Sequence, residues 1–193
     1  SFPAACRKAK CAAATALGLM SASNSASVDV QKVAEDVARL LHEDSWESRA
    51  AACDAIGLMG PQASDQVMKL TTLFDDDMFA VRASAARACG KLRDASSSSA
   101  LVDILTDKAP TVREAAVLAL ADLGGDVSEY IGKVFDRTAD ASPAVRAAAI
   151  TALSRMGAKG ELYASGVAQH LSLEEAPVVR IAALEALGKM GDP

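Results

Sequence analysis

Residues 140–157 have the sequence DASPAVRAAAITALSRMG, and this stretch decides the fold. An acidic residue and a proline precede a Val-Arg pair, a run of alanines follows, and a Met-Gly pair closes the stretch. Alanine has the highest helix propensity, proline is tolerated in the first turn of a helix, and glycine favours the position just past its end. The stretch therefore predicts one α-helix between Pro143 and Gly157.

Near-copies of this arginine-alanine motif occur five times along the chain, with the arginines at positions 49, 82, 113, 146 and 180. Each copy runs on to a small residue eight positions after its arginine: Gly57, Gly90, Ala121, Ser154 and Gly188. A weaker sixth copy opens the chain, where Lys10 stands eight residues before Gly18. Successive basic anchors are 39, 33, 31, 33 and 34 residues apart, and a period of this length indicates a repeat protein.

Each interval between anchors contains two helical patterns. In the upstream pattern apolar residues recur at helical spacing, as at Val30, Val33 and Val37. The downstream pattern is the Arg-Ala-Ala helix, closed by Gly57–Gly60, Met156-Gly157 or Met190-Gly191, where glycine can take the left-handed conformation. Three such helices carry a proline three residues before the arginine, which places it in the first turn: Pro110, Pro143 and Pro177.

These patterns predict an all-α protein, a right-handed α-α superhelix of about five helix pairs plus one leading helix. The second helix of an incomplete repeat is expected over residues 1–20, followed by a Ser-rich loop over 21–27. The five helix-pair repeats are expected over 28–60, 61–93, 94–125, 126–158 and 159–193. The chain starts inside a repeat and stops at the close of one, without the polar caps that terminal repeats normally need, so we expect it to be part of a longer solenoid.

An acidic residue accompanies each clear arginine, six positions before it and at the predicted turn between two helices. Arginine makes planar two-point hydrogen bonds with carboxylates and with turn carbonyls, so it can tie successive turns together. Five-fold repetition at equivalent positions favours a structural ladder over catalytic groups. The predicted ladder consists of Glu43, Arg49, Asp76, Arg82, Asp107, Arg113, Asp140, Arg146, Glu174 and Arg180.

The pattern D-x-x-x-x-V-R-x-A-A-x-x-A-L-G-x-M-G, clearest in Asp140–Gly157 and Val179–Gly191, resembles a HEAT repeat over essentially the whole chain. The short period and the closing residues Leu187–Pro193 resemble the bilin-lyase-type HEAT-like subgroup. An armadillo repeat fits less well, because it is longer, has three helices and carries an Asn ladder that is absent here. The resemblance implies an armadillo-like helical solenoid, a fold that serves many unrelated tasks.

Composition excludes several other classes of protein. The 193 residues include 42 alanines but only four Phe, two Tyr and one Trp, which argues against β-sandwiches and barrels. A net charge of −5 disfavours nucleic-acid and anionic-membrane binding, and no segment is apolar enough to insert into a bilayer. The cysteines form no C-x-x-C motif, which favours buried thiols in a reducing intracellular compartment, cytoplasmic or organellar: Cys6, Cys11, Cys53 and Cys89.

Two enzyme groups belong to the family that the resemblance implies. In deoxyhypusine hydroxylases, the resemblance implies a di-iron site built from four His-Glu pairs spread over the repeats. This chain has two histidines and one such pair, His42-Glu43. This activity is therefore excluded unless further repeats restore it. A bilin-lyase-like enzyme, or a chromophore or protein chaperone, is the alternative function. Walker, G-x-G-x-x-G and G-x-S-x-G motifs are absent, and we expect no catalytic residue, cofactor or metal.

The second helices are expected to line the concave side, with the residues one, five and nine positions after the anchor facing outward. These columns mix charges of both signs with apolar side chains, without a basic stripe or an aromatic platform. We therefore predict a non-enzymatic protein–protein interaction scaffold or complex subunit. Its partner-binding residues on the concave face are predicted to be Arg87, Lys91, Leu118, Arg155, Ile181 and Lys189. The rival surface is the outer face, where Lys69, Lys133 and Tyr163 are expected.

Overall fold

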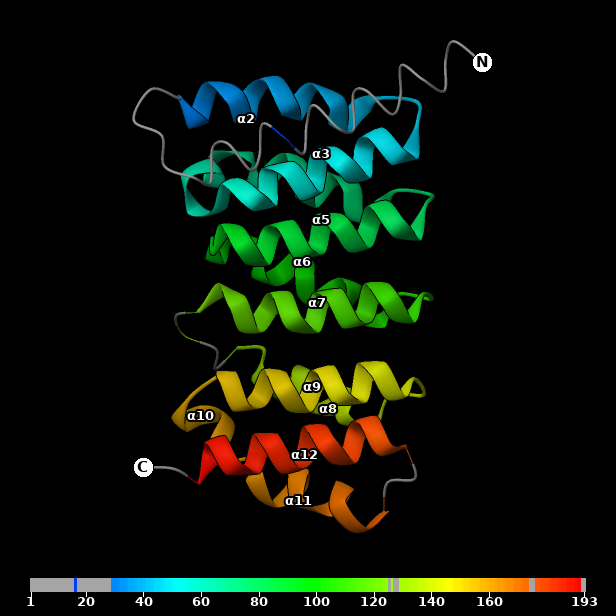
Figure 1. Ribbon diagram of the computed structural model, residues 1–193, viewed down its shortest axis with the longest axis vertical. Coiled ribbons are helices and arrows are strands. Elements are labelled where there is room, and N and C mark those ends of the chain that lie inside the picture. Colours follow the sequence, from blue (N-terminus) through cyan, green and yellow to red (C-terminus); the bar gives the residue numbers. More distant parts are fainter. Residues whose placement is uncertain (1–15, 17–28, 125, 127–128, 174–175, 192–193) are drawn as a thin grey trace.

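The computed structural model describes residues 16, 29–124, 126, 129–173 and 176–191. Every element within these residues is helical, and the helices stack along one axis, from α2 at one end to α11 and α12 at the other (Figure 1). The predicted all-α repeat fold is confirmed. No helix in this part of the chain combines the length and the apolarity that a membrane crossing needs.

The second helices of the five pairs form one layer, seen at the front of Figure 1. They are α3 (Trp46–Met59), α5 (Phe79–Leu92), α7 (Pro110–Leu123), α9 (Pro143–Arg155) and α12 (Pro177–Met190). As predicted, the three prolines are the first residues of α7, α9 and α12, where the missing N–H costs no intrahelical hydrogen bond. Each second helix packs directly against the next one along the stack.

The first helix of each pair is divided into short α and 3-10 segments. In chain order these are α2 (Val30–Ala38) with η1 (Arg39–His42); η2 (Gly60–Gln66), α4 (Val67–Thr71) and η3 (Thr72–Asp75); η4 (Ala95–Ser97), α6 (Ser98–Asp103) and η5 (Ile104–Thr106); α8 (Ile131–Asp136) and η6 (Arg137–Ala139); and α10 (Ala158–Glu161) and α11 (Ala164–Leu173). Consecutive second helices pack against each other along the whole stack. We call the outward surface of their layer the inner face, because the sequence pattern predicts that this layer lines the concave side.

Glycines with a positive φ follow three of the described second helices, Gly124 after α7 and two that the sequence indicates. Gly60 after α3 and Gly157 after α9 have φ angles of 65° and 61°, a region that side chains with a Cβ rarely adopt. Gly191 after α12 does not adopt this conformation, because its φ is −98°. Its N–H donates to the Leu187 carbonyl oxygen at 3.0 Å, so the helical hydrogen-bond pattern continues to this residue.

Small residues let consecutive second helices approach closely. A Cβ atom on Gly90 would lie 2.6 Å from the Ala119 Cα, and one on Gly57 would lie 3.1 Å from the Ala88 Cα. A Cβ atom on Gly188, the equivalent residue of α12, would meet nothing within 4 Å. The small residue eight positions after the arginine is therefore where one second helix touches the next.

Apolar burial in a second helix depends on the repeat that follows it. The residue four positions after the arginine is 0% exposed in the first four second helices: Cys53, Ala86, Val117 and Ile150. The equivalent Leu184 of α12 is 61% exposed, since no described helix packs against that side of α12. Burial in this column thus comes from the neighbouring pair and not from the helix pair itself.

Arginine side chains join successive inter-helix turns. The Nε and Nη2 atoms of an arginine donate to both carboxylate oxygens of the acid at the next turn, 25 to 27 residues later. The pairs are Arg49–Asp76, Arg82–Asp107 and Arg113–Asp140, with N···O distances between 2.7 and 3.0 Å. The Nη1 atom of each arginine also donates to the carbonyl oxygen six residues earlier, at 2.7 or 2.8 Å. Each guanidinium therefore bridges its own turn and the next one.

The acceptor carboxylates are positioned by their own turns. Asp76, Asp107 and Asp140 follow the 3-10 segment that ends a first helix, and one carboxylate oxygen of each accepts the N–H two residues later at 2.7 to 2.9 Å. Burial, the largest single effect, raises the pKa of these carboxyls. The hydrogen bonds from arginine and from the backbone outweigh it, so each pKa lies below its ordinary value. All three carboxylates are therefore charged at neutral pH.

The remaining members of the predicted ladder lie at its ends. Glu43 supplies a carbonyl oxygen, which accepts from Arg49 Nη1 at 2.8 Å. Arg146 donates to the carbonyl oxygen six residues before it, also at 2.8 Å. Glu174 lies outside the described residues, and Arg180 of α12 is exposed to solvent with no described acid beyond it.

Replacing Gly90 with Ala should lower the free energy of unfolding by about 1–3 kcal/mol, because the new Cβ collides with the backbone of α7. The matched control is Gly188→Ala, which should raise it by about 0.5–1 kcal/mol, since alanine is the better helix former and the space is open. Chemical denaturation measures both changes. Equal shifts of the two variants would contradict the close contact.

Replacing Arg113 with Ala should lower the free energy of unfolding by about 1–3 kcal/mol, the usual cost of losing charged hydrogen bonds in a partly buried site. Arg180→Ala is the control inside the described chain and should have a much smaller effect, because that side chain is exposed. The sequence predicts the same for Lys10, which lies outside the described residues. Identical melting temperatures for Arg113→Ala and the parent would rule out a stabilising ladder.

The ladder should also make stability depend on pH. The folded pKa values of Asp76, Asp107 and Asp140 lie below the unfolded value of about 3.9, so their contribution is complete above that value and is lost as the pH falls through the folded pKa. Melting temperatures measured from neutral pH downward should fall steeply below pH about 4. In Asp107→Asn, which has one of these carboxylates fewer, the fall should be shallower. Parallel curves for the two proteins would contradict this assignment.

Candidate functional site

The outward side chains of the second helices form the inner face of the solenoid. The six residues predicted to bind a partner are distributed over four of these helices: Arg87 and Lys91 on α5, Leu118 on α7, Arg155 on α9, and Ile181 and Lys189 on α12. Leu118 is half-buried and the other five are exposed. The structure therefore places all six on one face, spread over the length of the stack.

The positive charges of this face are not equivalent. Arg155 forms an ion pair with Asp122 of the neighbouring helix α7. Arg87 donates to the hydroxyl of a serine three residues earlier at 2.9 Å. Lys91 and Lys189 make no ion pair with another described residue. A partner would consequently meet the charges of Arg87, Lys91 and Lys189 more readily than that of Arg155.

A trough of about 390 Å³ lies over α9, between α7 and α12. Its floor consists of short side chains on α9, namely Ala144, Ala147, Ala148 and Thr151. Its walls are longer side chains of the two flanking helices: Glu114 and Leu118 on α7, and Val178, Ile181 and Glu185 on α12. The hollow exists because the middle helix carries smaller outward residues than its neighbours. The aligned repeats of the sequence do not show this hollow, because it depends on how far the side chains of three neighbouring helices project from the surface.

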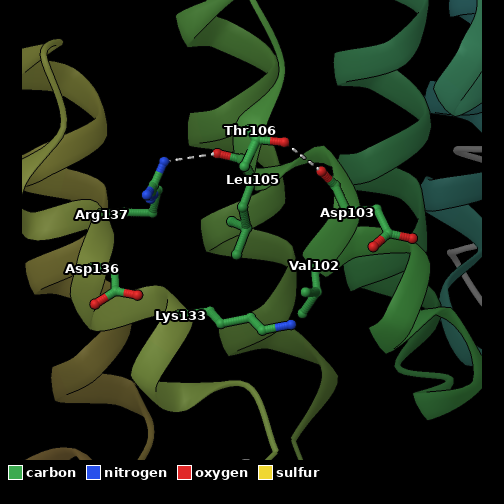
Figure 2. Close-up of a pocket in the computed structure, with 7 residues that line it drawn as sticks. All are labelled: Val102, Asp103, Leu105, Thr106, Lys133, Asp136 and Arg137. Carbon is green, nitrogen blue, oxygen red and sulfur yellow. Dashed lines mark hydrogen bonds between the residues drawn. The ribbon is translucent and has the colours of Figure 1, made fainter.

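A second hollow, of about 290 Å³, lies among the first helices of the third and fourth pairs (Figure 2). Arg137 contributes an Nη1 atom that donates to the Leu105 carbonyl oxygen at 3.2 Å, while its buried Nε has no hydrogen-bond partner among the described residues. Lys133 and the carboxylates Asp103 and Asp136 also line the hollow, so that two cations balance two anions.

The residues of the rival outer surface differ in exposure. Lys133 and Lys69 are exposed, and the Nζ atom of Lys69 donates to the Gln66 Oε1 at 2.8 Å. Tyr163 is half-buried, with its ring centroid 4.7 Å from that of Phe135. The outer face thus offers two separated lysines and no exposed aromatic ring at the predicted position.

The described cysteines belong to the core. Cys53 in α3 and Cys89 in α5 are both fully buried, and burial raises the pKa of the Cys89 thiol to about 12 and that of Cys53 further still. Such thiols are neutral and poor nucleophiles. Cys6 and Cys11 lie outside the described residues. Within the described part of the chain no group of three or more His, Cys, Asp or Glu side chains is placed to hold a metal ion.

Solved structures similar to this chain are repeat solenoids. An engineered protein from a structural genomics programme is 20% identical, with a TM-score of 0.68 over 96% of this chain and 91% of that one. The complex of CpcE and CpcF of phycocyanin lyase from Nostoc sp. PCC7120 contains a chain 22% identical, with a TM-score of 0.64 over 80% of this chain and 98% of that one. A designed armadillo repeat protein in complex with the peptide (KR)4 is 22% identical, with a TM-score of 0.55 over 88% and 90% of the two chains.

These structural likenesses, all below 25% identity, show the fold alone. No curated protein matches the chain significantly. The family model described as HEAT repeats matches residues 68–130 and 131–193, which together make up well over half of the chain. The helix pairs, their period and this match agree with the resemblance carried by the repeated Val-Arg-Ala-Ala phrase, and the chain belongs to the HEAT-repeat family.

Proposed function

We propose that this protein is a non-enzymatic scaffold, or a subunit of a larger assembly, that binds another protein through the inner face of its second helices. The observation that carries the proposal is the separation of two sets of residues on these helices. Alanine, glycine and arginine columns are used to pack one repeat on the next. The outward columns one, five and nine positions after the arginine contain the exposed residues that remain open to a partner, although their alanines at positions 83 and 147 are buried.

The character of the open columns supports a protein as the ligand. They combine exposed apolar side chains such as Ile181 with charges of both signs, Lys91 and Glu185 among them. Arginine and large apolar side chains contribute most of the energy in protein interfaces, whereas a nucleic acid would need a run of positive charge. The designed armadillo protein similar to this chain is in complex with a peptide, which is consistent with a solenoid of this kind taking a polypeptide ligand.

A bilin-lyase-like activity remains the alternative proposal, and its support is the shared fold of the phycocyanin lyase complex. It is tested by titrating the purified protein with an open-chain tetrapyrrole and recording the visible absorbance. A shifted and sharpened absorption band would favour pigment handling. An unchanged pigment spectrum would favour the scaffold.

The scaffold proposal is tested by comparing two charge-reversal variants in pull-downs quantified by mass spectrometry. The inner variant is Arg87→Glu with Lys91→Glu; Arg155 is left intact because its reversal would place a carboxylate against Asp122. It should capture at least about ten-fold less partner than the parent, as expected for interface charges, with an unchanged helical circular-dichroism signal.

The matched outer variant reverses Lys69 and Lys133, which lie on the first helices. It should capture as much partner as the parent. Loss of capture by this variant, with retention by the inner one, would place the partner on the outer face and overturn the assignment.

A further inference from the structure

We propose that the trough over α9 binds an amphipathic α-helix of a partner protein, whose apolar stripe is flanked on both edges by Lys or Arg. This inference rests on the proposed function, since it takes the inner face as the binding surface. It goes further by assigning the trough as the site and by naming the chemical class of the bound segment.

The shape of the trough fits a helix. The hollow follows the direction of α9, because its floor residues Ala144, Ala147 and Thr151 recur at helical spacing along that helix. Helices pack about 8–10 Å apart, and small side chains allow the closest approach. A helix laid over the alanines would lie between the walls of α7 and α12, which is the helix-in-groove mode of peptide recognition.

The walls offer apolar anchoring to such a helix. Val178 and Ile181 of α12 are 52% and 55% exposed, and Leu118 of α7 is half-buried on the opposite wall. Single exposed apolar residues are common on protein surfaces, whereas several gathered around one hollow indicate a binding surface. An apolar stripe on the ligand helix would cover all three.

The charges at the edges select the ligand. Glu114 on α7 and Glu185 on α12 line opposite walls, and neither accepts a hydrogen bond nor forms an ion pair with another described residue. Glu114 is one position after its arginine and Glu185 five positions after, so the two carboxylates lie diagonally across the trough. A basic residue on each edge of the ligand helix would pair with one of them, and an acidic helix would be repelled.

A partner protein fits this site better than a second copy of the chain. The apolar faces of the described helices that precede α12 are packed within the stack, where they form the core. None of the described helices that precede α12 therefore presents a free apolar stripe between two basic edges, and the exposed Val178 and Ile181 of α12 belong to the wall of the trough itself.

The test uses two fluorescent, side-chain-stapled helical peptides of about 16 residues, long enough to remain helical with a staple. Both carry the same leucine stripe, and they differ only in having lysine or glutamate along both edges. Fluorescence anisotropy with the full chain should show the lysine peptide binding at least about ten-fold more tightly than the glutamate peptide.

Two variants locate the binding. Glu114→Gln with Glu185→Gln should weaken binding of the lysine peptide about ten-fold, because both ion pairs are lost. Ala147→Phe, which fills the floor, should abolish it. The control is Glu129→Gln: Glu129 is exposed beside Ser98 and Lys133 of the first helices and does not line the trough, so the affinity should be unchanged. Circular dichroism verifies the fold of every variant.

The proposal is overturned if the two peptides bind equally, if the double Gln variant binds the lysine peptide like the parent, or if no binding is detected up to about 1 mM, the limit of weak specific association. A dimer of the parent that Ala147→Phe dissociates would show a second copy in the trough and would also overturn it. If these results occur while Arg87→Glu with Lys91→Glu still prevents partner capture, the proposed function stands and only the assignment of the trough fails.

Discussion

A guanidinium that hydrogen-bonds to two successive inter-helix turns is the interaction on which the rest of this structure depends. Arg82 donates through Nη1 to the carbonyl oxygen of Asp76 at its own turn and through Nε and Nη2 to both carboxylate oxygens of Asp107 at the next turn. Because arginine stays charged at any physiological pH and presents its donors in a rigid plane, it sets both the distance and the orientation of the two turns. Helix pairs that are individually small thereby share one axis.

The close spacing of the second helices follows from this constraint together with the small residues. Once the turns are joined, the helices that start from them lie side by side, and Gly57 and Gly90 allow them to touch along their far ends. Each repeat then completes the burial of the previous one, as the contrast between Val117 and Leu184 shows. Stability of this kind is approximately a sum over nearest neighbours. The exposed residues of the outward columns, such as Arg87, Lys91 and Ile181, take little part in this packing, which leaves them open to vary for binding.

The sequence predicts the fold well because its signals are repeated and local. The period of the anchors, the prolines before the arginines and the small residues after them all lie within one helix pair, and they locate the helices and their direction. The sequence predicts which residues belong to the ladder, but it does not predict which carboxylate pairs with which arginine. An acid stands six residues before each arginine, and Arg49, Arg82 and Arg113 each have another acid 25 to 27 residues after them. The two spacings are equally periodic, and only the structure shows that the later carboxylate is the partner.

Features that depend on several helices at once could not be predicted from the sequence. The pairing of Arg155 with Asp122 joins residues 33 positions apart on neighbouring helices. The trough requires α9 to carry smaller outward residues than both α7 and α12. Glu114 and Glu185 stand in the outward columns of the sequence, but their position on opposite walls of one hollow is a property of the assembled stack. The ending of α12 at Gly191 likewise departs from the glycine rule that holds at Gly60 and Gly157.

The measurement that tests the connection between repeats most directly is a pair of double-mutant cycles on unfolding free energy. One cycle combines Arg82→Ala with Asp107→Asn, across the turn-to-turn bridge, and the other combines Arg82→Ala with Asp76→Asn, within one turn. We expect a coupling of about 1–3 kcal/mol in the first cycle and less than half of that in the second, because the Asp76 carboxylate bonds with Arg49 and not with Arg82. A stronger coupling between Arg82 and Asp76 would show that the arginines stabilise single turns and do not join one repeat to the next.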